Sequence, residues 1–164
     1  MNRFSTFYKY IFLALMGAGG LVFSSLFLSC DSQRVYDHFA HTPLQGWEKN
    51  DSLRFDVPPL KQPGAYTMTL SLRHNESYPF TSISLIVDQR IFPGKRGRTD
   101  TIKCELFQKA SPGGNGVSTI QHEYPLHRLV LSRGDSLHIS VRHNMKREIL
   151  PGISDVGIRL RLQN

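Results

Sequence analysis

The stretch Ala65-Tyr66-Thr67-Met68-Thr69-Leu70-Ser71-Leu72-Arg73 decides the fold class of this chain. Every second residue from Tyr66 to Leu72 is large and apolar, and the residues between them are polar. Alternation with a period of two indicates a β-strand that buries one face and exposes the other. We therefore expect a half-buried strand here.

The same alternation recurs on both sides of this stretch. It occurs at residues 53–57, 83–87, 102–106, 137–141 and 156–162. Leu129 and Leu131 lead through Ser132-Arg133-Gly134-Asp135 into the segment 137–141, a spacing typical of a hairpin. No amphipathic helix separates these segments. The pattern predicts an all-β chain, an antiparallel β-sandwich of about seven to eight strands, either immunoglobulin-like or jelly-roll.

The first 29 residues have the order of charges and apolar residues found in a secretory signal. Arg3 and Lys9 precede an apolar run from Tyr10 to Leu28, and no acidic residue occurs before Asp31. The run is also long enough to be a retained transmembrane helix, which is the alternative interpretation.

Cys30 closes this apolar run. The segment Phe27-Leu28-Ser29-Cys30 resembles the lipobox of bacterial lipoproteins, although Phe27 stands where that motif usually has Leu, Val or Ile. We expect residues 1–29 to be removed as a lipoprotein signal peptide and acyl chains on Cys30 to anchor the protein in a membrane. Residues 30–45 are then expected to form a lipid-anchored tether, and residues 46–164 the β-sandwich domain.

Composition fits one exported domain. Removal of residues 1–29 would leave 135 residues and lower the formal net charge from +7 to +5, with histidines neutral. That length is enough for one domain with a core of its own. The run Lys95-Arg96-Gly97-Arg98 could touch phosphate or lipid headgroups, but it is first expected to be a solvated hairpin tip. No nucleic-acid partner is expected for an exported lipoprotein.

The chain lacks the motifs of enzymes, cofactor sites and metal sites. It has no G-x-S-x-G nucleophile elbow and no phosphate-binding or dinucleotide glycine motif. None of its histidines forms an H-x-H, H-E-x-x-H or histidine-cysteine pair, and the close pairs His38/His41 and His122/His127 lack a third ligand at a telling interval. We therefore expect no catalytic residue, cofactor, metal or small-molecule substrate. His74, His138 and His143 lie on or beside predicted strands and are expected to face solvent. Cys104 is in phase with its apolar neighbours and is expected to be a buried, unpaired thiol.

The aromatic residues leave two interpretations open. Trp47, the single tryptophan, is expected to cap the edge of the sandwich core. Alternatively, Trp47 together with Tyr66, Tyr78 and Tyr124 could stack on sugar rings. The second interpretation would make the protein a carbohydrate-binding lipoprotein of a glycan-uptake system.

Short segments along residues 30–164 carry a family resemblance. They are Cys30-Asp31-Ser32, Val35-Tyr36-Asp37, Trp47 with Asp51-Ser52, Leu72-Arg73-His74-Asn75, Tyr78-Pro79-Phe80, Ser84-Leu85-Ile86-Val87, Met145-Lys146-Arg147, Leu150-Pro151-Gly152-Ile153 and Asp155-Val156-Gly157-Ile158-Arg159. In this order they resemble the gliding-motility lipoprotein family GldH of Bacteroidetes-type bacteria. The resemblance covers almost the whole chain after the signal and is weakest at residues 91–119.

The resemblance implies a non-enzymatic envelope lipoprotein that works through other envelope proteins. It implies an association with the gliding machinery, which in these bacteria is connected with type IX secretion. The segment Asp31-Ser32-Gln33-Arg34 lacks the acidic run that resembles a surface-export signal, so we expect a periplasm-facing domain, with the outer membrane favoured. The candidate interaction or framework residues are Trp47, Tyr78, Pro79, Phe80, Asp155 and Gly157.

Overall fold

The computed structural model describes residues 33–106 and 119–163, and this part of the chain is built from strands. Cys30 lies outside the described residues. The strands are β1 (Arg34–His41), β2 (Trp47–Glu48), β3 (Leu53–Val57), β4 (Gly64–His74), β5 (Ser82–Phe92), β6 (Arg96–Glu105), β7 (Ile120–Leu131), β8 (Ser136–His143), β9 (Ile149–Leu150) and β10 (Ile153–Gln163). Within these ranges, no helix has the length and apolar character that a membrane crossing requires.

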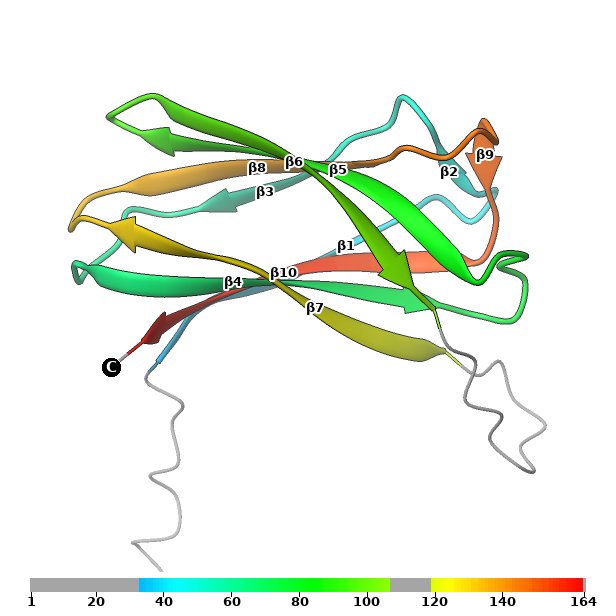
Figure 1. The fold of residues 1–164 in the computed structure, drawn as a ribbon, viewed down its shortest axis with the longest axis horizontal. Coiled ribbons are helices and arrows are strands. Elements are labelled where there is room, and N and C mark those ends of the chain that lie inside the picture. The colour runs from blue at the N-terminus through cyan, green and yellow to red at the C-terminus, as the bar shows by residue number, and fades with distance from the viewer. Residues whose placement is uncertain (1–32, 107–118, 164) are drawn as a thin grey trace, which may run out of the picture. The chain divides into compact units, whose positions relative to one another are not determined.

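Two four-stranded antiparallel sheets face each other (Figure 1). One has the strand order β1-β10-β4-β7 and the other has the order β3-β8-β5-β6. The short strands β2 and β9 form a separate two-stranded ribbon. The predicted antiparallel β-sandwich is therefore confirmed, with eight long strands in its two sheets.

The strand order distinguishes between the two sandwich types that we predicted. In the two described sheets, β5 and β6 are the only hydrogen-bonded neighbours that also follow each other directly in sequence. An immunoglobulin-type sandwich pairs several consecutive strands. The present sandwich has eight long strands, and its chain repeatedly crosses from one sheet to the other. Its arrangement is therefore that of a jelly roll.

The alternating segments supply the core. Met68, Leu70 and Leu72 of β4 are fully buried and lie opposite Leu160, Ile158 and Val156 of β10. Leu137, Ile139 and Val141 of β8 are buried in the same way on the facing sheet. Each such side chain contributes about 1.5–3 kcal/mol of transfer free energy when it leaves water. Cys104 is fully buried and unpaired, as predicted.

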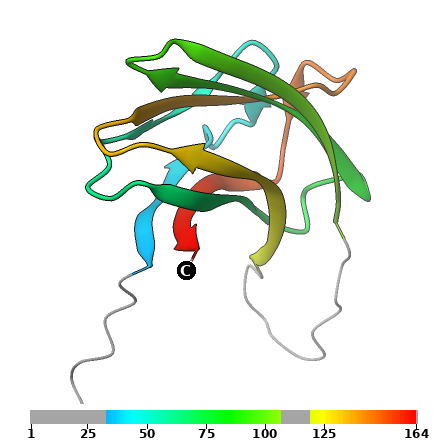
Figure 2. The same cartoon turned by 60° about the vertical axis from the view of Figure 1, so that its left-hand side comes forward.

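Strand β1 changes the expected domain boundary. Residues 34–41 lie within the stretch 30–45, which we expected to be a tether, yet they pair with β10 along their length (Figure 2). Tyr36 and Ala40 pack against the core, but the polar residues of this edge strand hide the alternation. The described sandwich therefore includes residues well before position 46.

The sandwich has two distinct ends, which we define by their loops. The basal end holds Gln33 and the loops 58–63, 93–95 and 132–135, and the distal end holds the loops 42–46, 75–81, 144–148 and 151–152. Gln33 is fixed at the basal end because its carbonyl accepts a 2.8 Å hydrogen bond from the Leu162 N–H. In Figure 1 the basal end is on the left and the distal end is on the right.

Candidate functional site

The distal end is built around Trp47. Its side chain is fully buried, and its indole N–H donates a 3.1 Å hydrogen bond to the carbonyl of Asp51. The backbone of Trp47 pairs with Leu150 in the β2–β9 ribbon. Trp47 therefore packs as a core residue, as the first of our two interpretations predicted.

His143 connects Trp47 to the loop after β8. Its Nε2 donates to the carbonyl of Trp47 at 3.1 Å, and the Met145 N–H donates to its Nδ1 at 3.4 Å. Both ring nitrogens of the neutral tautomer are thus satisfied. Burial is the main cause that lowers the pKa of His143, and the charge of Lys49 lowers it further.

Our expectation that His143 faces solvent was wrong. Its position in β8 has the same parity as Leu137 and Val141, so the period-two rule places it inward. The period-two pattern of the sequence already indicated a buried position, but we predicted exposure because histidine is polar. His138 has the opposite parity and is exposed, as predicted.

His74 is the second histidine that we wrongly expected to be exposed. It is almost fully buried at the end of β4, where its ring stacks on His122 of β7 with the two Nε2 atoms 3.2 Å apart. The Nδ1 of His74 faces the carbonyl of Asn75, an acceptor, so this nitrogen carries the proton in the neutral ring. His74 Nε2 then accepts from His122, whose pKa is lowered by burial and by the neighbouring His74. Among the described residues, no cluster of three metal-ligating side chains includes this pair.

Tyr78 and Gly152 join two distal loops. Gly152 has φ +80°, and a Cβ at this position would lie 2.2 Å from the backbone nitrogen of Tyr78. Tyr78 is buried, and its hydroxyl donates to the carbonyl of Ser82 at 2.9 Å. Burial raises the pKa of this hydroxyl, with a smaller effect from Cys104. Pro79 and Phe80, which follow Tyr78, are exposed.

Asp155 and Gly157 lie on the outer face of β10, away from the core. A Cβ on Gly157 would come within 2.7 to 2.9 Å of three atoms of the Phe39 ring, so the ring can occupy this place only above a glycine. The guanidinium of Arg73 lies over the same ring, 3.9 Å from its centroid. Asp155 is buried, and its Oδ1 lies 2.5 Å from the Nδ1 of His41.

Three large apolar side chains at the distal end face solvent. Leu44 is fully exposed, and the exposed fractions of Ile149 and Phe80 are 45% and 40%. Leu44 and Ile149 come from neighbouring segments, because a Cβ on Gly46 would touch the side chain of Ile149. We call Leu44, Ile149 and Phe80 the distal apolar surface. Leu44 and Ile149 lie on neighbouring segments and Phe80 on another loop of the same end, and exposed apolar surface of this kind is a feature of protein contact sites. Phe80 was among the candidate residues predicted from the sequence, whereas Leu44 and Ile149 were missed because they are isolated apolar residues without a periodic pattern.

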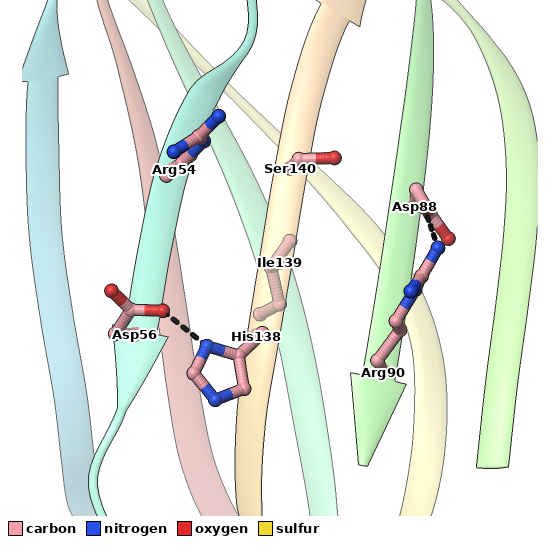
Figure 3. A pocket seen from close by; sticks show the side chains of 7 residues that line it. All are labelled: Arg54, Asp56, Asp88, Arg90, His138, Ile139 and Ser140. Carbon is pink, nitrogen blue, oxygen red and sulfur yellow. Dashed lines mark hydrogen bonds and ion pairs between the residues drawn. The ribbon is translucent and has the colours of Figure 1, made fainter. Parts of the chain in front are cut away.

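A shallow depression lies on the outer face of β3, β8 and β5 (Figure 3). It is lined by Arg54, Asp56, Asp88, Arg90, His138, Ile139 and Ser140. Its carboxylates are paired, because Asp56 lies 2.5 Å from the Nδ1 of His138 and Asp88 lies 3.7 Å from Arg90. The hydroxyl of Ser140 points away from His138, so these residues do not form the hydrogen-bonded chain of a serine hydrolase.

The aromatic rings considered for sugar stacking are not available. The exposed fractions of Trp47, Tyr66 and Tyr78 are 0%, 1% and 2%. Tyr124 is partly buried, and its hydroxyl donates to the carbonyl of Glu105 at 2.5 Å. Burial raises the pKa of this hydroxyl to about 12. The proposed stacking platform was therefore wrong.

Two solved structures are similar to this chain at low sequence identity. The globular domain of zebrafish complement 1qA is 13% identical and matches with a TM-score of 0.41 over 81% of this chain and 98% of its own. A protein from Sulfurospirillum deleyianum is 6% identical and matches with a TM-score of 0.42 over 79% of this chain and 98% of its own.

Sequence comparison identifies closer relatives. The chain is 31% identical to the gliding motility lipoprotein GldH of Flavobacterium johnsoniae, over 90% of this chain and 98% of the relative. It is 23% identical to the gliding motility lipoprotein GldH homolog of Christiangramia forsetii, over 82% of this chain and 88% of the relative. The model of the GldH lipoprotein family matches residues 34–160. The chain therefore belongs to the GldH lipoprotein family.

Proposed function

We propose that this chain is a non-enzymatic envelope lipoprotein that assists the gliding machinery and its linked type IX secretion by binding other envelope proteins. The observation that carries the proposal is the distal apolar surface, Leu44, Ile149 and Phe80. It lies at the end of the sandwich opposite Gln33, where the N-terminal segment joins the domain. A partner can reach this surface while the N-terminus is held at a membrane.

The anchor is the first part of the proposal. Residues 1–29 act as the signal peptide, and acyl chains on Cys30 hold the domain at the periplasmic side of the outer membrane. Each buried CH₂ of an acyl chain contributes about 0.8 kcal/mol, so two or more chains suffice for stable anchoring. Mass spectrometry of the mature N-terminus tests this part, and an unacylated Cys30 or an intact Met1 would contradict it.

The distal surface is the second part. The side chain of Leu44 contributes no burial free energy to folding, because it remains fully exposed in the folded domain. Its burial against a partner would contribute about 1.5–3 kcal/mol. The framework below is well fixed by Trp47, His143 and Gly152, so little further ordering of the backbone opposes binding.

Site-specific crosslinking in intact cells tests the surface directly. A photoreactive amino acid at Leu44 or Ile149 is expected to capture envelope proteins that are identified by mass spectrometry. The same amino acid at Thr101, which is exposed on β6, is the matched control. Identical products from the distal and control positions, or none from the distal ones, would exclude this surface.

A functional assay complements the crosslinking. We expect Leu44→Asp with Ile149→Asp to reduce colony spreading, or secretion by the type IX route in a strain that does not glide, because the charges oppose burial of the surface. Val130→Asp is the control, because Val130 is 75% exposed but lies outside the distal surface. Protein abundance must be equal in all strains. Equal loss with the control variant would refute a specific role of the distal end.

A further inference from the structure

We propose that the basal end of the sandwich lies against an anionic lipid surface through Lys61, Lys95 and Arg133. The proposal rests on the acylation of Cys30 proposed above. It adds a second contact with the membrane and an orientation of the domain.

The three cations belong to one surface because their loops contact each other. The Leu60 N–H donates to the carbonyl of Asp135 at 2.9 Å, and the Gly134 N–H donates to the carbonyl of Leu60 at 2.8 Å. These bonds join the loop of Lys61 to the turn of Arg133. Arg96, next to Lys95, forms an ion pair with Asp135 at 3.5 Å and so connects the third loop.

The charge of this surface is not offset locally. Lys61, Lys95 and Arg133 are exposed, and among the described residues none of them forms an ion pair. Asp135 is the acidic side chain on these loops, and it is buried. Its Oδ2 accepts the Ser132 N–H at 2.9 Å and pairs with Arg96, so it does not neutralise the three outer cations.

Chain length places Gln33, which lies at the same end of the sandwich as these loops, near the anchor. Gln33 lies at the basal end, and Cys30 precedes it by three residues. Three residues span at most about 11 Å even when fully extended. Electrostatic attraction decays over about 8 Å at physiological ionic strength. An acylated Cys30 would therefore keep Gln33, and with it the basal end of the sandwich, turned toward the membrane whose anionic headgroups attract Lys and Arg.

The chemistry of the basal loops favours lipid headgroups over a protein partner. The described loops that carry the three cations hold no exposed large apolar side chain, and the exposed Val35 and Val130 lie on the neighbouring strands β1 and β7. Lysine is a strongly hydrated point charge on a flexible stem, which suits mobile headgroups better than a fixed complementary surface.

Vesicle binding of a non-acylated chain tests the surface without the anchor. The mature chain with Cys30→Ser is sedimented with phosphatidylcholine vesicles that contain or lack phosphatidylglycerol. We expect preference for the anionic vesicles, reduced on the order of 100-fold by Lys61→Glu, Lys95→Glu and Arg133→Glu together. The matched control changes Arg142, Lys146 and Arg147 to Glu, which alters net charge equally away from the basal end. Equal losses in both triple variants, or no lipid preference, would overturn the proposal.

Lysine labelling of the acylated protein in vesicles tests the orientation. Lys61 and Lys95 are expected to react several-fold more slowly on anionic than on zwitterionic vesicles, whereas Lys146 reacts equally on both. Unchanged labelling of Lys61 and Lys95, or their crosslinking mainly to an acidic protein in cells, would overturn the proposal. If Cys30 proves to be unacylated, the anchor fails while the sedimentation result still stands, so the two failures are distinguishable.

Discussion

At the scale of single residues, Gly157 shows how one missing side chain shapes the outer face of β10. Gly157→Ala places a methyl group in the space of the Phe39 ring and is expected to lower the free energy of unfolding by about 1–3 kcal/mol. Denaturant unfolding measures the change. Gly97→Ala is the control, because a Cβ there would make ordinary contact at 3.7 Å. Combining Gly157→Ala with Phe39→Leu should recover part of the loss, and an unchanged stability of the single variant would contradict the steric argument.

The lowered pKa of His143 makes the stability of the folded protein depend on pH. Its pKa is lowered in the folded protein, mainly by burial, so the unfolded chain binds the proton first, at about pH 6.5. Stability from this group is complete above that pH, decreases as the pH falls through it, and levels off below the folded pKa. His122 and His127 act in the same direction.

Trp47 provides the measurement for this prediction. It is the single tryptophan and lies 5.4 Å from His143 between ring centroids, so its fluorescence reports unfolding next to the histidine. Denaturant unfolding at pH 7.5 and pH 5.5 should show a smaller pH dependence in His143→Gln than in the unmodified protein. An identical dependence in both proteins would show that His143 does not contribute.

At the scale of elements, the burial of one face decides which strands could be predicted from the sequence. The inner strands β4, β5, β8 and β10 were recognised from alternation because they bury one face along most of their length. Of the edge strands, β3 and the second half of β6 were also recognised, whereas β1 and most of β7 carry polar residues on both faces, so β1 was mistaken for a tether and β7 was recognised only at its end. The ribbon of β2 and β9 was missed because two-residue strands have no period.

The site was predicted less completely than the fold. Trp47, Tyr78 and Gly157 were singled out, and each has a local reason in packing or hydrogen bonding. The presence of Leu44, Ile149 and Phe80 at one end depends on how loops far apart in sequence are placed by the fold. A single sequence contains no signal for that placement.

On the outer face of the sheet, Arg159 links β10 to β1 and β7. Arg159 of β10 bonds to Asp37 of β1 at 3.0 Å and to both carboxylate oxygens of Glu123 of β7 at 3.0 and 3.1 Å. Arg159→Lys is expected to lower the free energy of unfolding by about 1 kcal/mol, because a lysine cannot reproduce the planar fork. Arg128→Lys on exposed β7 is the control. Equal thermal unfolding of the two variants would show that the network contributes little.

At the scale of the whole molecule, the two ends have different surfaces. The distal end presents the apolar side chains of Leu44, Ile149 and Phe80, and the basal end, where Gln33 lies, presents the cations of Lys61, Lys95 and Arg133. We expect a flexible Gly-Ser insertion between Ser32 and Gln33 to leave the unfolding free energy unchanged, because it lies outside the strands. On anionic vesicles, however, the amine labelling of Lys61 should increase, since the proposed anchor on Cys30 would no longer hold the basal end close. Unaltered labelling would show that the loops bind lipid without help from the short tether.

The pairing of β1 with β10 also has a mechanical consequence. The hydrogen bonds of antiparallel strands are perpendicular to the strand axis. A pull between an anchor before Gln33 and a partner at the distal end would run along β1, whose residues pair with β10 from Arg34 to His41. Such a force loads these bonds together in shear and does not open them one after another, so the first strand of the domain is attached in the orientation that best resists tension.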